Sequence, residues 1–171
     1  MTKPGFDEKY IFRLIEPKEW EQAANLEIAC FPPNEACKPE MMHRRVLNSP
    51  DMFLMAIERE TGIFAGMIDG AATDREKLTD DFFTDEKTHD PEGCNCMILG
   101  VMTRPEFQRQ GLAGEMMRRY ASLQRRSGKK KMILTCLEGK IAMYASFGFE
   151  DLGWSESQWG GECWHEMEMT L

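Results

Sequence analysis

Residues 97–114 join a short apolar strand to a helix through a tight turn, and this join constrains the fold more than any other part of the chain. The strand is predicted over residues 97–101, Pro105 ends it, and a helix is predicted from Gln108 onward. A helix that begins in small residues leaves several backbone N–H groups unpaired, all pointing one way at the positive end of the helix dipole. The turn is therefore a candidate binding site for a pyrophosphate.

Two glycines in this turn support that interpretation, because a side chain at Gly111 or Gly114 would hold phosphate groups away from the backbone. The bare pattern Gln108-x-x-Gly111-x-Ala113 also fits an ordinary capped strand-to-helix turn. A Walker A loop is excluded, because the Gly-Lys-Ser/Thr ending is absent. A dinucleotide fingerprint fits poorly, because no glycine precedes Gln108 at the required spacing.

In its context, the segment resembles the acetyl-CoA signature of the GCN5-related N-acetyltransferase (GNAT) superfamily, Gln/Arg-x-x-Gly-x-Gly/Ala after a strand and a proline. The resemblance implies acetyl-CoA as co-substrate, with the CoA diphosphate on the loop amides and the pantetheine on the main chain of the preceding strand. The cofactor-binding residues implied are Val101, Met102 and Thr103 in the strand and Gln108, Arg109, Gln110, Gly111, Leu112, Ala113 and Gly114 in the loop.

Hydrophobic patterning predicts an alternating order of strands and helices along the chain. Strands are expected at residues 10–15, 52–58, 63–71, 97–101, 131–137, 149–154 and 163–170, and helices at 17–28, 39–47, 74–83, 108–123 and 140–147. The resemblance implies an α/β (α+β) GNAT fold with a mixed, mostly antiparallel seven-stranded sheet. In that fold about four helices flank the sheet and the central strands splay apart.

Length and composition predict a single domain over residues 1–171, with residues 1–8 as a flexible N-terminal tail. No apolar run is long enough to span a bilayer, and the start lacks the apolar stretch of a signal peptide. The six cysteines lack metal-ligand spacing, so we expect free thiols, no metal and a cytoplasmic location. A net charge of -8 argues against binding to nucleic acid. We expect a monomer or weak homodimer.

Further stretches resemble the arylalkylamine (serotonin or dopamine) N-acetyltransferase branch of this superfamily. They are residues 31–37, 49–58, 66–78, 144–149 and 164–169. This resemblance implies acetyl transfer to a small primary amine such as serotonin or tryptamine, by direct attack in a ternary complex. The alternatives are a polyamine or peptide amino-group acetyltransferase, and a CoA-binding sensor module without catalytic activity.

Acetyl transfer to an amine needs a base for the protonated amine and a proton donor for the departing thiolate. Tyr144 lies where related enzymes have a tyrosine that reaches the cofactor sulfur, although its ring would equally pack a helix end. Vertebrate members carry two histidines at positions that are Met97 and Leu99 here, and neither side chain accepts a proton. Glu35 lies where insect members have a glutamate, and is the candidate base; its alternative role is to cap the following helix.

Apolar and aromatic residues are predicted to line the amine pocket, because aromatic rings pack against an arylalkyl group and attract a cation. The predicted set is Phe31, Pro32, Pro33, Leu99, Trp159 and His165. His165 is also a second candidate for the base. The missing histidine pair favours the sensor, whereas Tyr144, Glu35 and the phosphate-binding loop favour an enzyme.

Overall fold

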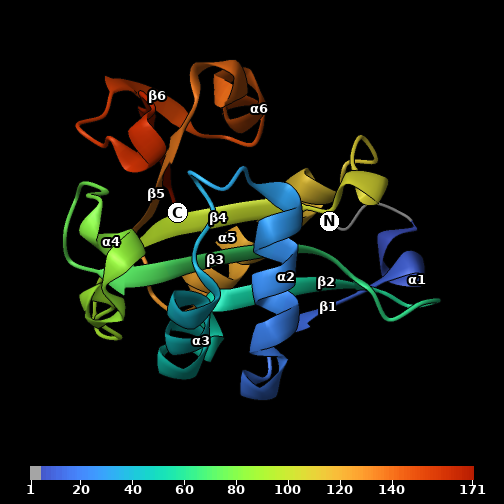
Figure 1. The fold of residues 1–171 in the computed structure, drawn as a ribbon. Helices are drawn as coiled ribbons and strands as arrows, with labels where there is room; N and C mark the ends of the chain where they lie inside the picture. Colours follow the sequence, from blue (N-terminus) through green and yellow to red (C-terminus); the bar gives the residue numbers. More distant parts are fainter. Residues whose placement is uncertain (1–4) are drawn as a thin grey trace. The chain divides into compact units, whose positions relative to one another are not determined.

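A computed structural model describes residues 5–171 and contains a seven-stranded sheet in the order β1-β2-β3-β4-β5-β7-β6 (Figure 1). The strands are β1 (Tyr10–Leu14), β2 (Phe53–Glu58), β3 (Phe64–Thr73), β4 (Asn95–Thr103), β5 (Lys131–Cys136), β6 (Glu150–Trp154) and β7 (His165–Thr170). The α-helices are α1 (Phe6–Lys9), α2 (Trp20–Cys30), α3 (Pro39–Asn48), α4 (Asp81–Thr84), α5 (Leu112–Arg126) and α6 (Ile141–Ser146). The predicted α/β class and seven-stranded, mostly antiparallel sheet are confirmed.

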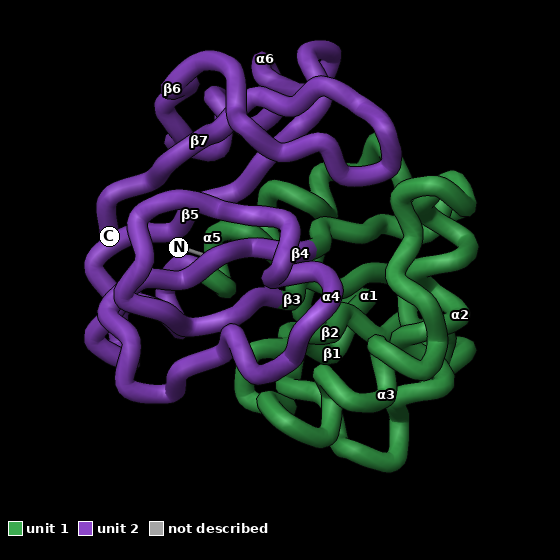
Figure 2. Tube along the Cα trace, turned by 60° about the vertical axis from the view of Figure 1, so that its left-hand side comes forward, with its two compact units in different colours: residues 1–69, 100–120 green, residues 70–99, 121–171 purple. Residues whose placement is uncertain are grey.

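The chain divides into two compact units, which Figure 2 draws in different colours. Among the described residues, unit 1 comprises residues 5–69 and 100–120, and unit 2 comprises residues 70–99 and 121–171. Strands β3 and β4 and helix α5 have residues in both units.

In unit 1, strand β3 is packed against helices on both of its faces. Asp69 of β3 pairs with Arg45 of α3, whereas a Cβ added to Gly66 would lie 2.6 Å from Cε of Met116 in α5. Successive side chains of a strand point to opposite faces, so residues 66 and 69 face different helices. The hydroxyl of Tyr120 in α5 donates to the Met52 carbonyl oxygen (2.9 Å), which ties α5 to the start of β2.

Part of the predicted N-terminal tail is ordered as α1. Phe6 is buried and its ring lies 6.4 Å from that of Tyr10, and Asp7 pairs with Arg119 of α5 (2.9 Å). The structured chain therefore begins earlier than predicted. The rest of the predicted tail, residues 1–4, lies outside the described residues.

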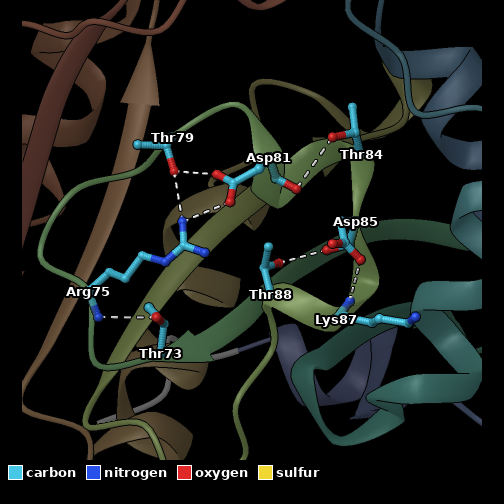
Figure 3. A network of polar contacts seen from close by, with 8 residues as sticks. All are labelled: Thr73, Arg75, Thr79, Asp81, Thr84, Asp85, Lys87 and Thr88. Carbon is cyan, nitrogen blue, oxygen red and sulfur yellow. Dashed lines mark hydrogen bonds and ion pairs between the residues drawn. The ribbon is translucent and has the colours of Figure 1, made fainter.

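The segment that follows β3 is less helical than predicted. The sequence predicts a helix over residues 74–83, but the structure has only the short α4 at the end of this segment, followed by a 3₁₀ turn at Glu86–Thr88. Figure 3 shows the cause: Arg75 donates to Thr79 (3.1 Å) and pairs with Asp81 (2.8 Å), while the Thr79 hydroxyl donates to Asp81. Local bonds between short polar side chains compete with helix formation.

In unit 2, β5 pairs in parallel with β4 and antiparallel with β7, which in turn pairs antiparallel with β6. The last β4–β5 residue pair is Met97–Ile133, and β4 continues beyond it to Thr103. A buried apolar cluster lies around this register. Its members are Ala71, Leu78, Phe82, Met97 and Ile133, with Phe83 and Leu99 packed against it.

Candidate functional site

The turn between β4 and α5 is the segment predicted to bind the CoA diphosphate. A 3₁₀ turn at Pro105–Phe107 follows the strand, and two residues then adopt left-handed backbone angles, Arg109 (φ 60°) and Gly111 (φ 82°). Helix α5 begins at Leu112, and the Gly111 carbonyl accepts from the Glu115 N–H (3.1 Å). As in any α-helix, the first N–H groups of α5 have no partners within the helix.

Two glutamine side chains brace this loop. Gln108 donates to the carbonyl oxygen of Thr103 (3.0 Å), and Gln110 accepts from the Lys9 ammonium group (2.9 Å). Gln108 thus ties the loop back to the end of β4, while Gln110 ties it to the end of α1. Both contacts use side-chain atoms, and the backbone N–H of Gln108 donates to the Pro105 carbonyl oxygen (3.3 Å).

The first turn of α5 also carries a paired acid. Arg118 and Arg119 each donate to the Glu115 carboxylate at 2.8 Å. Burial opposes ionisation of Glu115, but these two hydrogen bonds hold the pKa of its carboxyl below the ordinary value. The negative charge nearest the start of the helix is therefore compensated.

Glu35 lies on a short loop between α2 and α3, in unit 1. The N–H groups of Glu35 and Ala36 both donate to the Pro32 carbonyl oxygen, at 2.9 and 3.0 Å, which closes one tight turn. Glu35 and Phe31 are half-buried, whereas Pro32 and Pro33 are exposed. Proline fixes the backbone here, so the turn holds Glu35 in a defined position.

The beginning of this loop lies close to the predicted cofactor turn. Burial raises the pKa of the Cys30 thiol to about 11, and the charges of Arg104 and Glu106 act on it in opposite directions. Cys30 ends α2, while Arg104 and Glu106 precede the predicted phosphate-binding loop. Unit 1 therefore holds the predicted cofactor loop, the predicted base and the first three predicted pocket residues.

Tyr144 lies in unit 2, buried at the end of α6 between two phenylalanine rings. Its ring centroid is 6.0 Å from that of Phe147 and 5.9 Å from that of Phe149, both edge-on. Burial, and then the nearby Cys136 thiol, raise the pKa of the Tyr144 phenol well above its usual range. The hydroxyl therefore keeps its proton at any physiological pH, as a hydrogen-bond donor must.

His165 is held by an acid that the sequence analysis did not identify. Its Nδ1 lies 3.0 Å from Oδ1 of Asp151, and its ring lies 4.1 Å from that of Trp154. Its Nε2 is buried and has no hydrogen-bond partner among the described residues. His165 is opposite Cys136 in the β5–β7 register, so unit 2 brings this histidine close to the thiol that influences Tyr144.

Trp159 lies in the connection between β6 and β7, stacked on Phe83 with ring centroids 4.9 Å apart. Its carbonyl oxygen accepts from the indole N–H of Trp164 (2.9 Å), and Asp80 accepts from the adjacent Gln158 N–H (3.2 Å). Phe83 and Leu99 both pack against the buried cluster of Ala71, Leu78, Phe82, Met97 and Ile133. In unit 2, Trp159 therefore contacts a side chain that borders this cluster, and Leu99 borders the cluster directly.

The sequence analysis did not identify several charged residues that make long-range contacts in the two units. They are Glu27, Arg45 and Asp69 in unit 1, and Asp80 and Asp151 in unit 2. Only Asp69 could have been identified from the sequence, because it is the single charged residue in an otherwise apolar predicted strand. The others bond to residues far along the chain, and no local pattern marks them.

The described part of the chain has no group of three or more His, Cys, Asp or Glu side chains arranged to hold a metal ion. Across residues 5–171, no helix is both long and apolar enough to cross a membrane.

The reactivity of the Cys30 and Cys136 thiols can be tested. Burial raises the pKa of Cys30 and of Cys136 to about 11, so at pH 8 about one such thiol in a thousand is ionised. We expect iodoacetamide to label both about two hundredfold more slowly than an ordinary thiol of pKa near 8.5, in proportion to the ionised fraction. Exposed Cys163 should react first in a time course of peptide mass spectra. Labelling of Cys30 as fast as Cys163 in the native protein, rather than only after denaturation, would contradict this.

Comparisons with known proteins agree with this geometry. Residues 20–149 match the model of the Acetyltransferase (GNAT) family. The chain is 26% identical over 153 residues to "Probable hydrolase YhcX" of Bacillus subtilis (strain 168); the match covers 85% of this chain but only 29% of that protein's length. Among solved structures, it resembles the loading GNATL domain of CurA from Lyngbya majuscula (TM-score 0.79, 15% identity, 94% of this chain and 97% of that one). It also resembles Escherichia coli YhbS in complex with CoA (TM-score 0.66, 16% identity, 99% and 84%).

Proposed function

Because the chain belongs to the Acetyltransferase (GNAT) family, we propose that it transfers the acetyl group of acetyl-CoA to a small primary amine, an arylalkylamine such as serotonin or tryptamine. The observation that carries the proposal is the turn from β4 into α5. Its left-handed residues Arg109 and Gly111 lead into a helix start whose N–H groups have no partners within the helix. This arrangement suits the CoA diphosphate.

The amine attacks acetyl-CoA directly in a ternary complex. Its nitrogen forms a bond to the thioester carbonyl carbon, its proton passes to the base, and the C–S bond breaks to release CoA thiolate. Glu35 is the proposed base, acting directly or through water, since its loop fixes a half-buried carboxylate. Backbone N–H groups of β4 are suited to stabilise the oxyanion that develops on the carbonyl.

Tyr144 is the proposed donor to the departing thiolate. Its raised pKa keeps the hydroxyl protonated, so that it can donate a hydrogen bond to the thiolate, and also makes the phenol a weaker acid than free tyrosine. The rings of Phe147 and Phe149 pack edge-on against its ring. His165, which Asp151 holds through Nδ1, is the second candidate for the base. The observation that favours His165 as a base is its buried Nε2, which has no hydrogen-bond partner among the described residues.

The choice of an arylalkylamine rests on aromatic side chains found in each of the two units. Phe31 precedes the Glu35 turn, and Trp159 is stacked on Phe83. Rings of this kind pack on an aromatic substrate and attract its ammonium group.

All six cysteines are unpaired, which supports a reducing compartment such as the cytoplasm.

Replacing Glu35 by glutamine should remove the acidic rising limb from the pH profile of kcat/KM, because the amide cannot accept the amine proton. Activity near neutral pH should fall by about a hundredfold. Glu40→Gln, an exposed acid in the first turn of α3, is the matched control and should leave the profile unchanged. An unaltered profile in Glu35→Gln would move the base to His165 or to a chain of water molecules.

The substrate class is tested by mixing the purified protein with acetyl-CoA and a panel of amines, with products identified by mass spectrometry. The panel contains serotonin, tryptamine, phenethylamine, spermidine and a peptide. We expect turnover of the first three amines only. Turnover confined to spermidine or the peptide would overturn the arylalkylamine assignment. Tight acetyl-CoA binding without any product would favour the sensor module.

A further inference from the structure

A single buried residue, Glu27 of α2, closes both ends of the loop that carries Glu35. Its backbone carbonyl oxygen accepts from the Phe31 N–H (3.0 Å), and its side-chain Oε1 accepts from the Cys37 N–H (3.0 Å). Glu27 is 5% exposed, so water does not compete for these bonds. The ends of the loop are therefore fixed through one amino acid.

Glu27 belongs to a buried cluster of charges. Arg45 of α3, also buried, donates to Oδ2 of Asp69 and to the Cys37 sulfur (3.7 Å). Burial raises the pKa of the Glu27 carboxyl, while the Cys37 N–H and the charge of Arg45 act in the opposite direction. One guanidinium group thus lies among two carboxyl groups, and Cys37 contacts both Glu27 and Arg45.

The cluster reaches β4 through Asp69. Oδ1 of Asp69 is buried without a hydrogen-bond partner among the residues described, and a Cβ added to Gly100 would lie 2.6 Å from it. Gly100 immediately precedes Val101, the first residue of the predicted pantetheine-binding strand. The buried charges therefore connect the Glu35 loop to the strand that leads into the cofactor turn.

We propose that Glu27 is a positioning residue that holds the Glu35 loop at its working distance from β4, with Arg45 and Asp69 as its anchor to the sheet. This inference rests on the proposed role of Glu35. The essential element is the hydrogen bond from the Cys37 N–H to the Glu27 side chain, and the negative charge of Glu27 is secondary.

Two substitutions separate these elements. Glu27→Gln keeps an acceptor oxygen at full length and removes the charge, whereas Glu27→Asp keeps the charge but is shorter by one methylene. We expect Glu27→Gln to show amide exchange in residues 31–38 and amine kcat/KM within about twofold of wild type. Glu27→Asp should exchange these amides at least about tenfold faster, as expected when a buried backbone hydrogen bond is lost. Its amine kcat/KM should fall about tenfold with acetyl-CoA affinity unchanged.

Glu19→Asp is the matched control, since Glu19 is also buried in unit 1, pairs with Arg13 (2.8 Å) and accepts a backbone N–H, but from Glu16 (2.8 Å). It should leave exchange in residues 31–38 unchanged. If amide exchange and amine kcat/KM were normal in Glu27→Asp but impaired in Glu27→Gln, the charge of Glu27 would be the essential element and the proposal would be overturned. Unchanged exchange in Glu27→Asp, or loss of acetyl-CoA binding in both variants, would also overturn it. If the wild-type protein acetylates no amine, the proposed function fails, whereas the exchange comparison still decides whether Glu27 positions the loop.

Discussion

Replacing Tyr144 by phenylalanine should lower kcat by about a hundredfold or more, because the departing CoA thiolate loses its proton donor. Acetyl-CoA affinity should stay within about twofold, since the ring and its packing on Phe147 and Phe149 are retained. Because the pKa of Tyr144 is raised, the phenol stays protonated up to and beyond its ordinary pKa of about 10. No falling limb from this residue should therefore be seen in the wild-type pH profile below that pH.

The matched control is Tyr10→Phe. Tyr10 is buried in β1, and its hydroxyl has no hydrogen-bond partner among the described residues, so its removal should leave kcat unchanged and not destabilise the fold. Steady-state kinetics together with calorimetric acetyl-CoA binding separate the two effects. An unchanged kcat in Tyr144→Phe would remove Tyr144 as the acid and leave its ring with a packing role.

Replacing Gly111 by alanine should weaken acetyl-CoA binding by at least about tenfold. The residue has φ 82°, a left-handed conformation that costs an ordinary L-residue about 1–2 kcal/mol. The added methyl group would also hold the diphosphate away from the N–H groups at the start of α5. Calorimetry with acetyl-CoA measures the loss directly, without requiring an amine substrate.

Gly128→Ala separates strain from phosphate contact. Gly128 has φ 86°, close to the value at Gly111, and a Cβ there would meet nothing within 4 Å. It should lower thermal stability through backbone strain and leave acetyl-CoA affinity unchanged. If Gly111→Ala bound acetyl-CoA as tightly as wild type, the turn would be a simple helix cap and the proposed cofactor site would be wrong.

The features that the sequence predicted well are local in the chain. The turn with its glycines and the helix after it follow from residue types within a few positions of one another, although α5 begins at Leu112 rather than at the predicted Gln108 and ends at Arg126. The strands were predicted within a few residues of their observed bounds, because alternating or continuous apolar runs determine them. Residues 74–83 do not form the predicted helix, because the bonds of Arg75 and Thr79 to Asp81 compete with the backbone bonds of a helix.

The contacts of the residues that support the site could not be predicted from the sequence, because the partners are distant in the chain. Arg45 meets Asp69 from 24 residues away, and His165 meets Asp151 from a neighbouring strand. Trp159 was predicted as a pocket residue, but nothing local indicated that it stacks on Phe83. Such pairings depend on register and packing, which a single sequence does not specify.

Acetyl transfer from acetyl-CoA to tryptamine is the most direct test of the account. The protein is mixed with both compounds, and mass spectrometry follows the amine, CoA and the intact protein together. The account predicts N-acetyltryptamine in equal amount to the CoA released, with no acetylated protein, since attack is direct. CoA release accompanied by acetylation of the protein, or release without any acetylated amine in the presence of bound acetyl-CoA, would contradict it.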